Sequence, residues 1–175
     1  ITDCYASPLF KARAGSSHGY DICDHSRLNP EIGGELDFQA FTDALRDCGI
    51  GLILDVVPNH MSISSANAWW LDVLETGPSS PFAAYFDINW HSVRPDLENK
   101  VLLPILEDQY GKVLESGKLR LIYEDGAFSI CYYDTKLPLA PRTYSRILEK
   151  AMEKLDQVLD RQNEHFQELL SILTA

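Results

Sequence analysis

The sequence predicts an α/β protein whose first 60 residues form a parallel strand–helix–strand unit. Three observations predict it: an apolar segment at 1–9, a helical pattern at 35–48 and an apolar run at 50–57. Successive Leu, Ile and Val residues in the third segment are typical of a strand buried on both faces, as in a parallel sheet. Because strand–helix–strand crossovers are right-handed, the two strands should lie parallel.

Each element of this unit has its own sequence signal. The first strand mixes apolar and small residues, and a loop rich in small residues follows at 11–19. The dipeptides Asn29-Pro30 and Gly33-Gly34 are turn signals ahead of the helix. Apolar residues then recur at helical spacing, and Gly49 is a C-terminal stop signal; these apolar residues are Leu36, Phe38, Phe41, Ala44 and Leu45.

Polar side chains gather where the second strand ends. Pro58 ends the ladder because it has no N–H to donate. Asp55, Asn59 and His60 surround it, at the strand end where α/β barrels place their chemistry. Since parallel strands deliver their following loops to one face, the loop that carries Tyr20 should lie beside the loop that carries His60.

Two aromatic or imidazole side chains are the strongest binding candidates. The Tyr20 ring could stack on a sugar face, or it could be ordinary half-buried packing. His60 could donate a hydrogen bond to a bound hydroxyl, and the alternative is a structural histidine. His18 and Asp21 flank Tyr20 and could bind hydroxyls or only shape the turn.

Asp55 and Asn59 are candidates for supporting the site. Asp55 could hold the site's charges in place, or it could cap a loop or pair with an arginine. Asn59 could bind backbone, sugar or a metal, and a structural role is favoured. The sequence contains no metal constellation, phosphate loop or nucleophile elbow, so no metal or cofactor is expected.

Residues 61–140 break the strand–helix alternation and predict an inserted α+β subdomain. A short helix is expected at 67–75, and strands at 119–123 and 128–133 are joined by the hairpin signal Asp125-Gly126. Aromatic residues in this region could line a polysaccharide groove, although a small core is favoured; they are Trp69, Trp70, Phe86 and Trp90.

Residues 141–175 predict an amphipathic helix, or a helical pair that breaks at Asn163. Its apolar stripe requires a partner, which further sequence or another chain would supply. The stripe consists of Tyr144, Leu148, Met152, Leu155, Leu159, Phe166, Leu170 and Leu173.

Composition excludes some partners. The net charge of −11 argues against a nucleic-acid partner, which would require a basic stripe. The sequence has no long apolar span, so no membrane partner is expected. Four cysteines without C-x-x-C spacing predict reduced thiols in a cytoplasmic protein; they are Cys4, Cys23, Cys48 and Cys131.

Residues 55–60, DVVPNH, resemble the first signature of the α-amylase superfamily (glycoside hydrolase family 13). Several further segments extend the similarity over nearly the whole chain. Taken in order, they resemble the maltooligosyl trehalose synthases; the segments are 6–9, 15–24, 28–34, 52–61, 69–77, 86–90, 101–104 and 110–119.

The resemblance implies an N-terminal fragment of a (β/α)8 TIM barrel enzyme. Residues 1–60 would be barrel strand 2, helix 2 and strand 3, residues 61–140 the inserted subdomain B, and residues 141–175 a helical segment. The rest of the parent barrel, or self-association, would cover the fragment's exposed surfaces. The family is an intramolecular transglucosylase, an isomerase that turns the reducing-end α-1,4 linkage of a maltooligosaccharide into α,α-1,1 in trehalose biosynthesis.

The resemblance also implies roles for individual residues. Tyr20 would be a stacking platform and His60 a hydrogen-bond donor to the transferred glucose, with His18 and Asp21 nearby. Asp55 would support the site through an arginine near the nucleophile. The family's aspartate nucleophile and glutamate acid/base lie on later barrel strands, so the fragment alone is expected to be inactive.

Two alternatives remain open. One is a hydrolase of the same superfamily, such as an α-amylase. The other is a non-catalytic carbohydrate-binding or interaction module that keeps part of the barrel.

Overall fold

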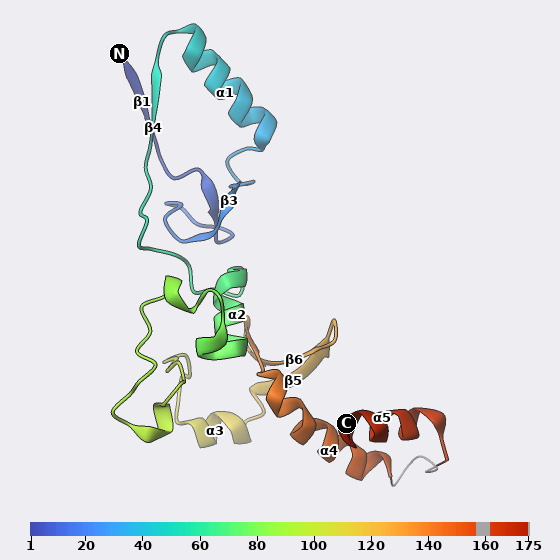
Figure 1. The fold of residues 1–175 in the computed structure, drawn as a ribbon. Coiled ribbons are helices and arrows are strands. Elements are labelled where there is room, and N and C mark those ends of the chain that lie inside the picture. Colours follow the sequence, from blue (N-terminus) through green and yellow to red (C-terminus); the bar gives the residue numbers. More distant parts are fainter. Residues whose placement is uncertain (157–161, 175) are drawn as a thin grey trace. The chain divides into compact units, whose positions relative to one another are not determined.

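The computed structural model describes residues 1–156 and 162–174, and the chain divides into two compact units, Ile1–Leu71 and Asp72–Ala175 (Figure 1). The predicted α/β class agrees with the observed mixture of helices and strands. The first unit contains β1 (Asp3–Ala6), β2 (Phe10–Ala12), β3 (Ile22–Leu28), α1 (Glu35–Asp47) and β4 (Gly51–Leu54).

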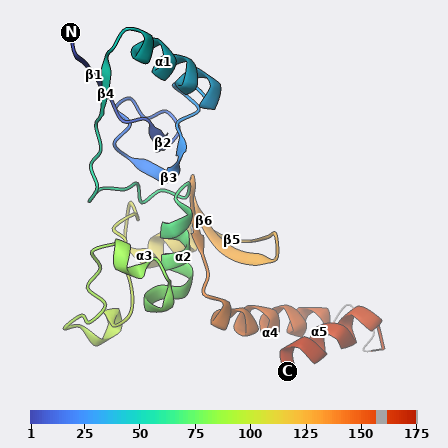
Figure 2. The ribbon, with the colours of Figure 1, turned by 45° about the horizontal axis from the view of Figure 1, so that its top comes forward.

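The predicted parallel pairing is confirmed. β1 lies beside β4 in Figures 1 and 2, and the two strands pair in parallel with Asp3 opposite Gly51 and Ala6 opposite Leu54. β2 and β3 pair antiparallel in a separate two-stranded sheet. The strand expected at 1–9 is therefore shorter than predicted, and the segment after Pro8 belongs to another sheet.

The expectation that β4 is buried on both faces is wrong for this structure. Ile53 is 48% exposed and Leu54 is 43% exposed. The reason is that β4 pairs with a single strand, β1, within its sheet. α1 contains no buried residue either, and its Leu36 side chain is exposed.

The ends of α1 follow from its flanking glycines. The Asp37 carboxylate accepts a hydrogen bond from the Gly34 N–H at 2.8 Å, which satisfies a donor at the helix start. At the other end, Gly49 has φ = +66°, in the left-handed region, and its N–H donates to the Arg46 carbonyl at 3.0 Å. The predicted stop at Gly49 is confirmed.

Asn67 anchors the segment after β4. Its side chain is fully buried, its Nδ2 donates to the Ser62 carbonyl at 2.7 Å, and its Oδ1 accepts from the N–H groups of Trp69 and Trp70 at 3.0 and 3.3 Å. It therefore caps α2 (Ala68–Thr76). Ser62 in turn donates its N–H to the Ile22 carbonyl at 2.9 Å, which ties this segment to β3.

We expect Asn67→Ala to open α2 locally. The substitution removes a helix cap and leaves the buried Ser62 carbonyl unpaired, which together cost about 2 kcal/mol, or about 30-fold in amide protection. Hydrogen exchange of residues 68–76 in the intact protein measures this. Asn163→Ala is the matched control, because the Asn163 Oδ1 caps α5 in the same way. Unchanged exchange at 68–76 would contradict the assignment.

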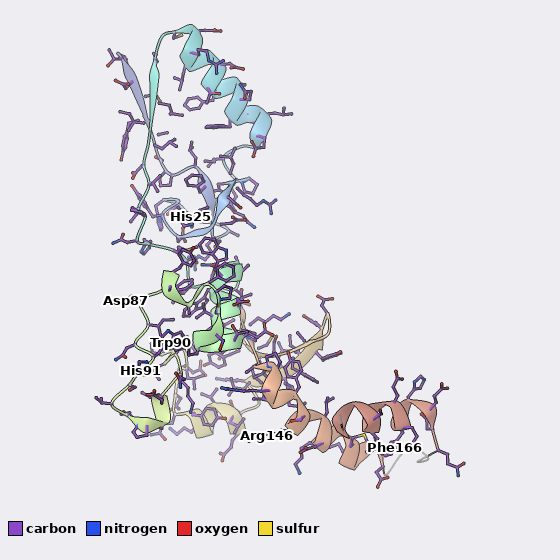
Figure 3. All side chains as sticks on the ribbon, viewed as in Figure 1. His25, Asp87, Trp90, His91, Arg146 and Phe166 are labelled. Carbon is purple, nitrogen blue, oxygen red and sulfur yellow. The ribbon has the colours of Figure 1, made fainter. Side chains whose placement is uncertain are left out.

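Aromatic rings line β3. The His25 ring, labelled in Figure 3, lies 6.0 Å from the Phe10 ring and 6.4 Å from the Trp69 ring, measured between centroids. Trp70 is buried. The favoured core role is thus confirmed for Trp70.

The second unit contains a three-stranded antiparallel sheet of β5 (Leu119–Glu124), β6 (Ala127–Tyr132) and β7 (Thr135–Pro138). The predicted hairpin at Asp125-Gly126 is confirmed, and β7 was not predicted. The unit also has α3 (Tyr110–Glu115), α4 (Tyr144–Leu155), α5 (Glu164–Thr174) and four short 3-10 helices, Gly77–Ser79, Ala83–Tyr85, Pro95–Leu97 and Pro141–Thr143.

The helical end is a pair, with Asn163 at the start of α5. The Asn163 Oδ1 accepts from the His165 and Phe166 N–H groups at 3.0 and 3.4 Å. Phe166, labelled in Figure 3, is buried, as its place in the apolar stripe predicts. Leu159 lies outside the described residues, as does the side chain of Leu173. In the described part of the chain, the helices fall short of the length and apolar character that a membrane crossing requires.

Candidate functional site

The site lies in the first unit, at the carboxyl ends of β1 and β4. The two strands end together because they are parallel and in register, and the Asp55 N–H continues the ladder by donating to the Ala6 carbonyl at 3.1 Å. Asp55 is therefore held at a fixed position directly beyond β4. The loop between β2 and β3 supplies the other predicted side chains of the site, His18, Tyr20 and Asp21.

A hydrogen bond joins the two predicted loops. The Tyr20 hydroxyl donates to the Asp55 Oδ2 at 2.6 Å, across 35 residues of sequence. This length is typical of a strong bond to a charged acceptor. The predicted proximity of the two loops is thus confirmed, through Asp55.

A second phenol, which the sequence analysis missed, influences the Asp55 carboxyl: that of Tyr5 on β1. Hydrogen bonds from the Tyr20 hydroxyl first, and then from the Tyr5 hydroxyl, lower the pKa of the Asp55 carboxyl below its ordinary value. The same carboxylate raises the pKa of both Tyr5 and Tyr20. The carboxylate therefore stays ionised and both phenols stay protonated at neutral pH.

Strand register offers a signal that could have found Tyr5. Tyr5 lies opposite Ile53 in the parallel pair, and Asp55 follows Ile53 by two residues. Side chains two residues apart on a strand share a face, so Tyr5 and Asp55 lie on the same face of the sheet. Register was needed to see this, because 50 residues separate the two in the sequence.

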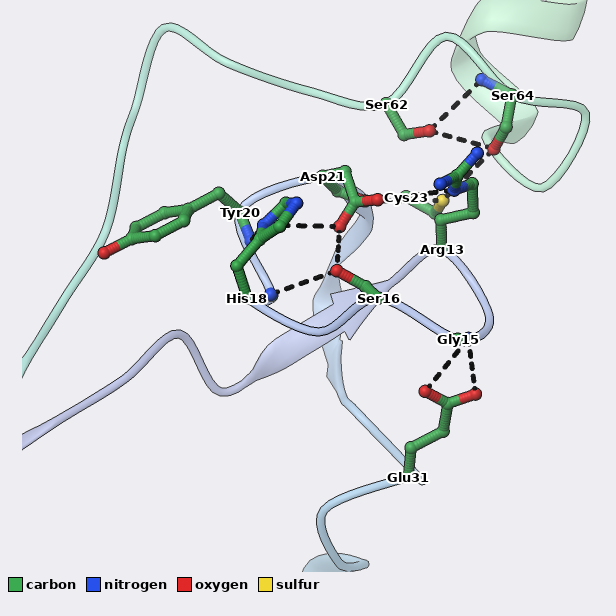
Figure 4. Close-up of polar contacts among 11 residues, drawn as sticks. Arg13, Gly15, Ser16, His18, Tyr20, Asp21, Cys23, Glu31, Ser62 and Ser64 are labelled. Carbon is green, nitrogen blue, oxygen red and sulfur yellow. Dashed lines mark hydrogen bonds and ion pairs between the residues drawn. The ribbon is translucent and has the colours of Figure 1, made fainter.

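His18 supports the backbone and ring of Tyr20. Its Nδ1 accepts a hydrogen bond from the Tyr20 N–H at 3.0 Å. The two rings are stacked, with centroids 5.8 Å apart and planes 22° from parallel. The Tyr20 ring points away from the cluster of Ser16 and Asp21 in Figure 4. His18 therefore packs against one face of the Tyr20 ring, and Asp55 holds its hydroxyl.

Asp21 organises the turn beneath Tyr20. Its carboxylate accepts from the Ser16 hydroxyl and lies 3.4 Å from the Arg13 Nε (Figure 4). Burial raises the pKa of Asp21, but the hydrogen bond from Ser16, the charges of His18 and Arg13 and its own backbone outweigh it, so the net shift is downward. Asp21 faces the loop interior, which supports a turn-shaping role.

Asn59 and His60 lie beyond these contacts. Both are exposed, and within residues 1–156 and 162–174 neither side chain makes a hydrogen bond or ion pair. The structure therefore brings Tyr20, Asp55, His18 and Asp21 into one network and leaves Asn59 and His60 outside it.

The network is suited to binding rather than to proton transfer. Asp55 accepts a hydrogen bond from the Tyr20 hydroxyl, and Asp21 accepts one from Ser16 and pairs with Arg13; both carboxyl pKa values are lowered. A general acid must hold its proton near neutral pH, which neither carboxyl does. A rigid aromatic ring beside hydrogen-bonding groups fits a neutral polyhydroxyl ligand.

The next features are the side chains that could bind a metal ion and the four cysteines. Among the described residues, no three His, Cys, Asp or Glu side chains gather closely enough to hold a metal ion. Cys4, Cys23, Cys48 and Cys131 are free thiols.

A cavity of about 680 Å³ lies in the second unit. Trp90, one of the aromatic residues that could line a groove, contributes to its wall, together with Asn99, Lys100 and Arg142. None of the predicted site residues lines it.

The chain is similar to several known proteins. The family model described as "Alpha amylase, catalytic domain" matches residues 1–113. A putative maltooligosyl trehalose synthase of Mycobacterium tuberculosis is 37% identical over 143 residues, which are 81% of this chain and 17% of that protein. The chain thus spans less than a fifth of the length of that relative.

Solved structures show the same similarity. The maltooligosyltrehalose synthase from Arthrobacter ramosus matches with a TM-score of 0.66 at 37% identity, over 79% of this chain and 17% of that one. A hypothetical maltooligosyl trehalose synthase of Sulfolobus tokodaii matches with a TM-score of 0.67 at 34% identity, over 90% of this chain and 20% of that one.

Proposed function

Because the chain belongs to the α-amylase family, whose catalytic domain matches residues 1–113, we propose that it is part of a maltooligosyl trehalose synthase. The observation that carries this proposal is the 37% identity to the Mycobacterium tuberculosis relative over 81% of the chain. The intact enzyme would convert the reducing-end α-1,4 linkage of a maltooligosaccharide into an α,α-1,1 linkage, with retention at the transferred carbon.

The proposed roles follow the geometry of the network. Tyr20 presents its ring to the transferred glucose, and Asp55 and His18 fix that ring by the 2.6 Å hydrogen bond and the stacked contact. His60, exposed and without a hydrogen-bond or ion-pair partner among the described residues, is available to donate to a glucose hydroxyl. Asp21 and Asn59 shape the two loops.

The chemical step needs two further side chains, a nucleophile and a general acid/base, besides these binding residues. In a retaining mechanism an aspartate attacks the anomeric carbon and expels the sugar oxygen, which a glutamate protonates. The same glutamate then removes the proton from the acceptor hydroxyl, which attacks the glycosyl-enzyme and releases the aspartate. We propose that these two carboxylates belong to further sequence of the intact enzyme.

The finer fold assignment is part of the same proposal. Residues 1–60 would supply strand 2, helix 2 and strand 3 of a (β/α)8 barrel, which the parallel β1–β4 pair supports. Residues 61–140 would be the inserted subdomain and residues 141–175 a helical segment. The remaining barrel would cover the exposed apolar side chains of β4 and α1, such as Leu36, Ile53 and Leu54.

We expect the 175-residue chain alone to leave maltopentaose unchanged, because Asp55 and Asp21 are both committed to other partners. A reducing-end assay of the chain beside the intact enzyme at equal concentration measures this. Loss of reducing ends with the short chain would contradict the placement of the catalytic carboxylates.

The same assay on the intact enzyme tests the function itself. A synthase lowers the concentration of reducing ends, because the product is non-reducing. A hydrolase of the superfamily would raise it, and a carbohydrate-binding module would leave it constant.

A further inference from the structure

We propose that Ser16 is a positioning residue of the site, whose hydroxyl holds both chain neighbours of Tyr20 and thereby fixes the direction in which the Tyr20 side chain leaves its loop. Ser16 lies in the loop between β2 and β3, ahead of Tyr20. The proposal rests on the proposed function, in which Tyr20 presents its ring to the transferred glucose.

The Ser16 hydroxyl makes one hydrogen bond on each side of Tyr20. Its Oγ accepts from the N–H of Gly19 at 3.0 Å and donates to the Oδ1 of Asp21 (Figure 4). Gly19 and Asp21 are the residues directly before and after Tyr20 in the chain. A hydroxyl carries one donor and two acceptor sites, so a single serine can make both bonds at once. One side chain therefore holds the backbone of Tyr20 from both neighbours.

Gly19 connects this turn to the strand pair of the site. It is buried and has φ = +77°, in the left-handed region. A Cβ on Gly19 would lie 3.2 Å from the Pro8 carbonyl oxygen, so its backbone runs close against the buried Pro8 between β1 and β2. The N–H that Ser16 accepts from thus belongs to a buried residue, where an unpaired donor costs free energy.

Asp21 is held at the other side of Tyr20 by Arg13. The Asp21 carboxylate lies 3.4 Å from the Arg13 Nε, and the Asp21 carbonyl accepts from the Arg13 N–H at 3.0 Å. The Ser16 N–H in turn donates to the Arg13 carbonyl at 3.0 Å. Because Arg13 fixes the backbone of both Ser16 and Asp21, the loop itself sets the position of the Ser16 hydroxyl.

The direction of the Tyr20 side chain follows from this backbone. The Tyr20 ring points away from Ser16 and Asp21 in Figure 4, and its hydroxyl reaches the Asp55 Oδ2 at 2.6 Å. The phenol meets Asp55 only while the Cα–Cβ bond of Tyr20 keeps its direction, which the backbone at 19–21 determines. Ser16 therefore acts on the reaction through Tyr20, by preorganising the ring before the glucose arrives.

The test compares Ser16→Ala with the wild type in the intact enzyme, with Ser17→Ala as the matched control. Ser17 is the next residue of the same loop and is exposed, and its side chain makes no hydrogen bond within residues 1–156 and 162–174. We expect Ser16→Ala to lower kcat about fivefold, the effect of one hydrogen bond, while KM stays within about twofold of the wild type. Ser16→Thr keeps the hydroxyl and should restore most of the lost kcat.

A double-mutant cycle with Tyr20 is the second readout, because it separates the positioning of Tyr20 from general support of the fold. If Ser16 acts through Tyr20, adding Ser16→Ala to the Tyr20→Ala enzyme should lower kcat by less than about twofold. An equal loss of kcat in both backgrounds would overturn the proposal, as would wild-type kcat in Ser16→Ala. If Ser16→Ala fails to fold, Ser16→Cys takes its place in the cycle, because a thiol is a weaker donor and acceptor than a hydroxyl.

The proposed function and the role of Ser16 can fail separately. The product of the wild-type enzyme decides the function, and the Ser16 comparison is made on whichever product forms, non-reducing or reducing. If the intact protein only binds maltopentaose, calorimetric affinities replace kcat in the same cycle. Equal affinity for Ser16→Ala and wild type would then overturn the role of Ser16, whereas a loss of affinity that disappears in the Tyr20→Ala background would support it.

Discussion

Tyr20→Ala in the intact enzyme is expected to lower kcat by about 100-fold, the largest effect of any single substitution in this chain. Two losses combine: the ring that faces the transferred glucose, and the 2.6 Å hydrogen bond that fixes Asp55. Steady-state kinetics with maltopentaose measure the change.

Tyr20→Phe separates the two losses. It keeps the ring and its stacking on His18 and removes only the donor to Asp55, so we expect a fall in kcat of about tenfold. Wild-type kcat in Tyr20→Ala, with the enzyme folded, would remove Tyr20 from the site.

His60→Ala is expected to lower kcat by roughly 50-fold, because hydrogen bonds to sugar hydroxyls strengthen as the oxocarbenium-like transition state forms. His60 is exposed, so its replacement should leave the fold intact. Kinetics on the intact enzyme, with thermal unfolding to check the fold, measure both statements.

Two substitutions calibrate the His60 result. His60→Gln retains a donor and should recover part of the lost kcat. His165→Ala removes an exposed histidine from α5 in the second unit and should change nothing. Equal kcat for His60→Ala and His165→Ala would contradict the role of His60.

The elements with local sequence signals were predictable. Asp125-Gly126 indicated the β5–β6 hairpin, Gly49 the end of α1, and Asn163 the break between the last two helices. In each case a short-range rule of backbone conformation or capping decides the structure.

Features that depend on distant partners were not predictable. The burial of β4 depends on strands beside it, and in the described part of the chain β4 pairs with β1 alone. β7 follows a tight turn in which Tyr133 adopts φ = +49°, a conformation that sequence rules assign to Gly, Asn or Asp.

In the candidate site, too, some features could be predicted from the sequence and others depend on distant partners. The strand-end position of Asp55 and the proximity of the Tyr20 loop followed from parallel pairing alone. Tyr5 did not, because its relation to Asp55 depends on the exact register of β1 against β4. A shift of one residue would place Tyr5 on the opposite face of the pair.

The most direct test is a proton NMR time course of the intact enzyme with maltopentaose, following the anomeric region. For a synthase, we expect the reducing-end signals to decline while an α,α-1,1 anomeric signal grows in equal amount, without free glucose. Growth of reducing-end signals would show a hydrolase instead, and would contradict the proposed synthase.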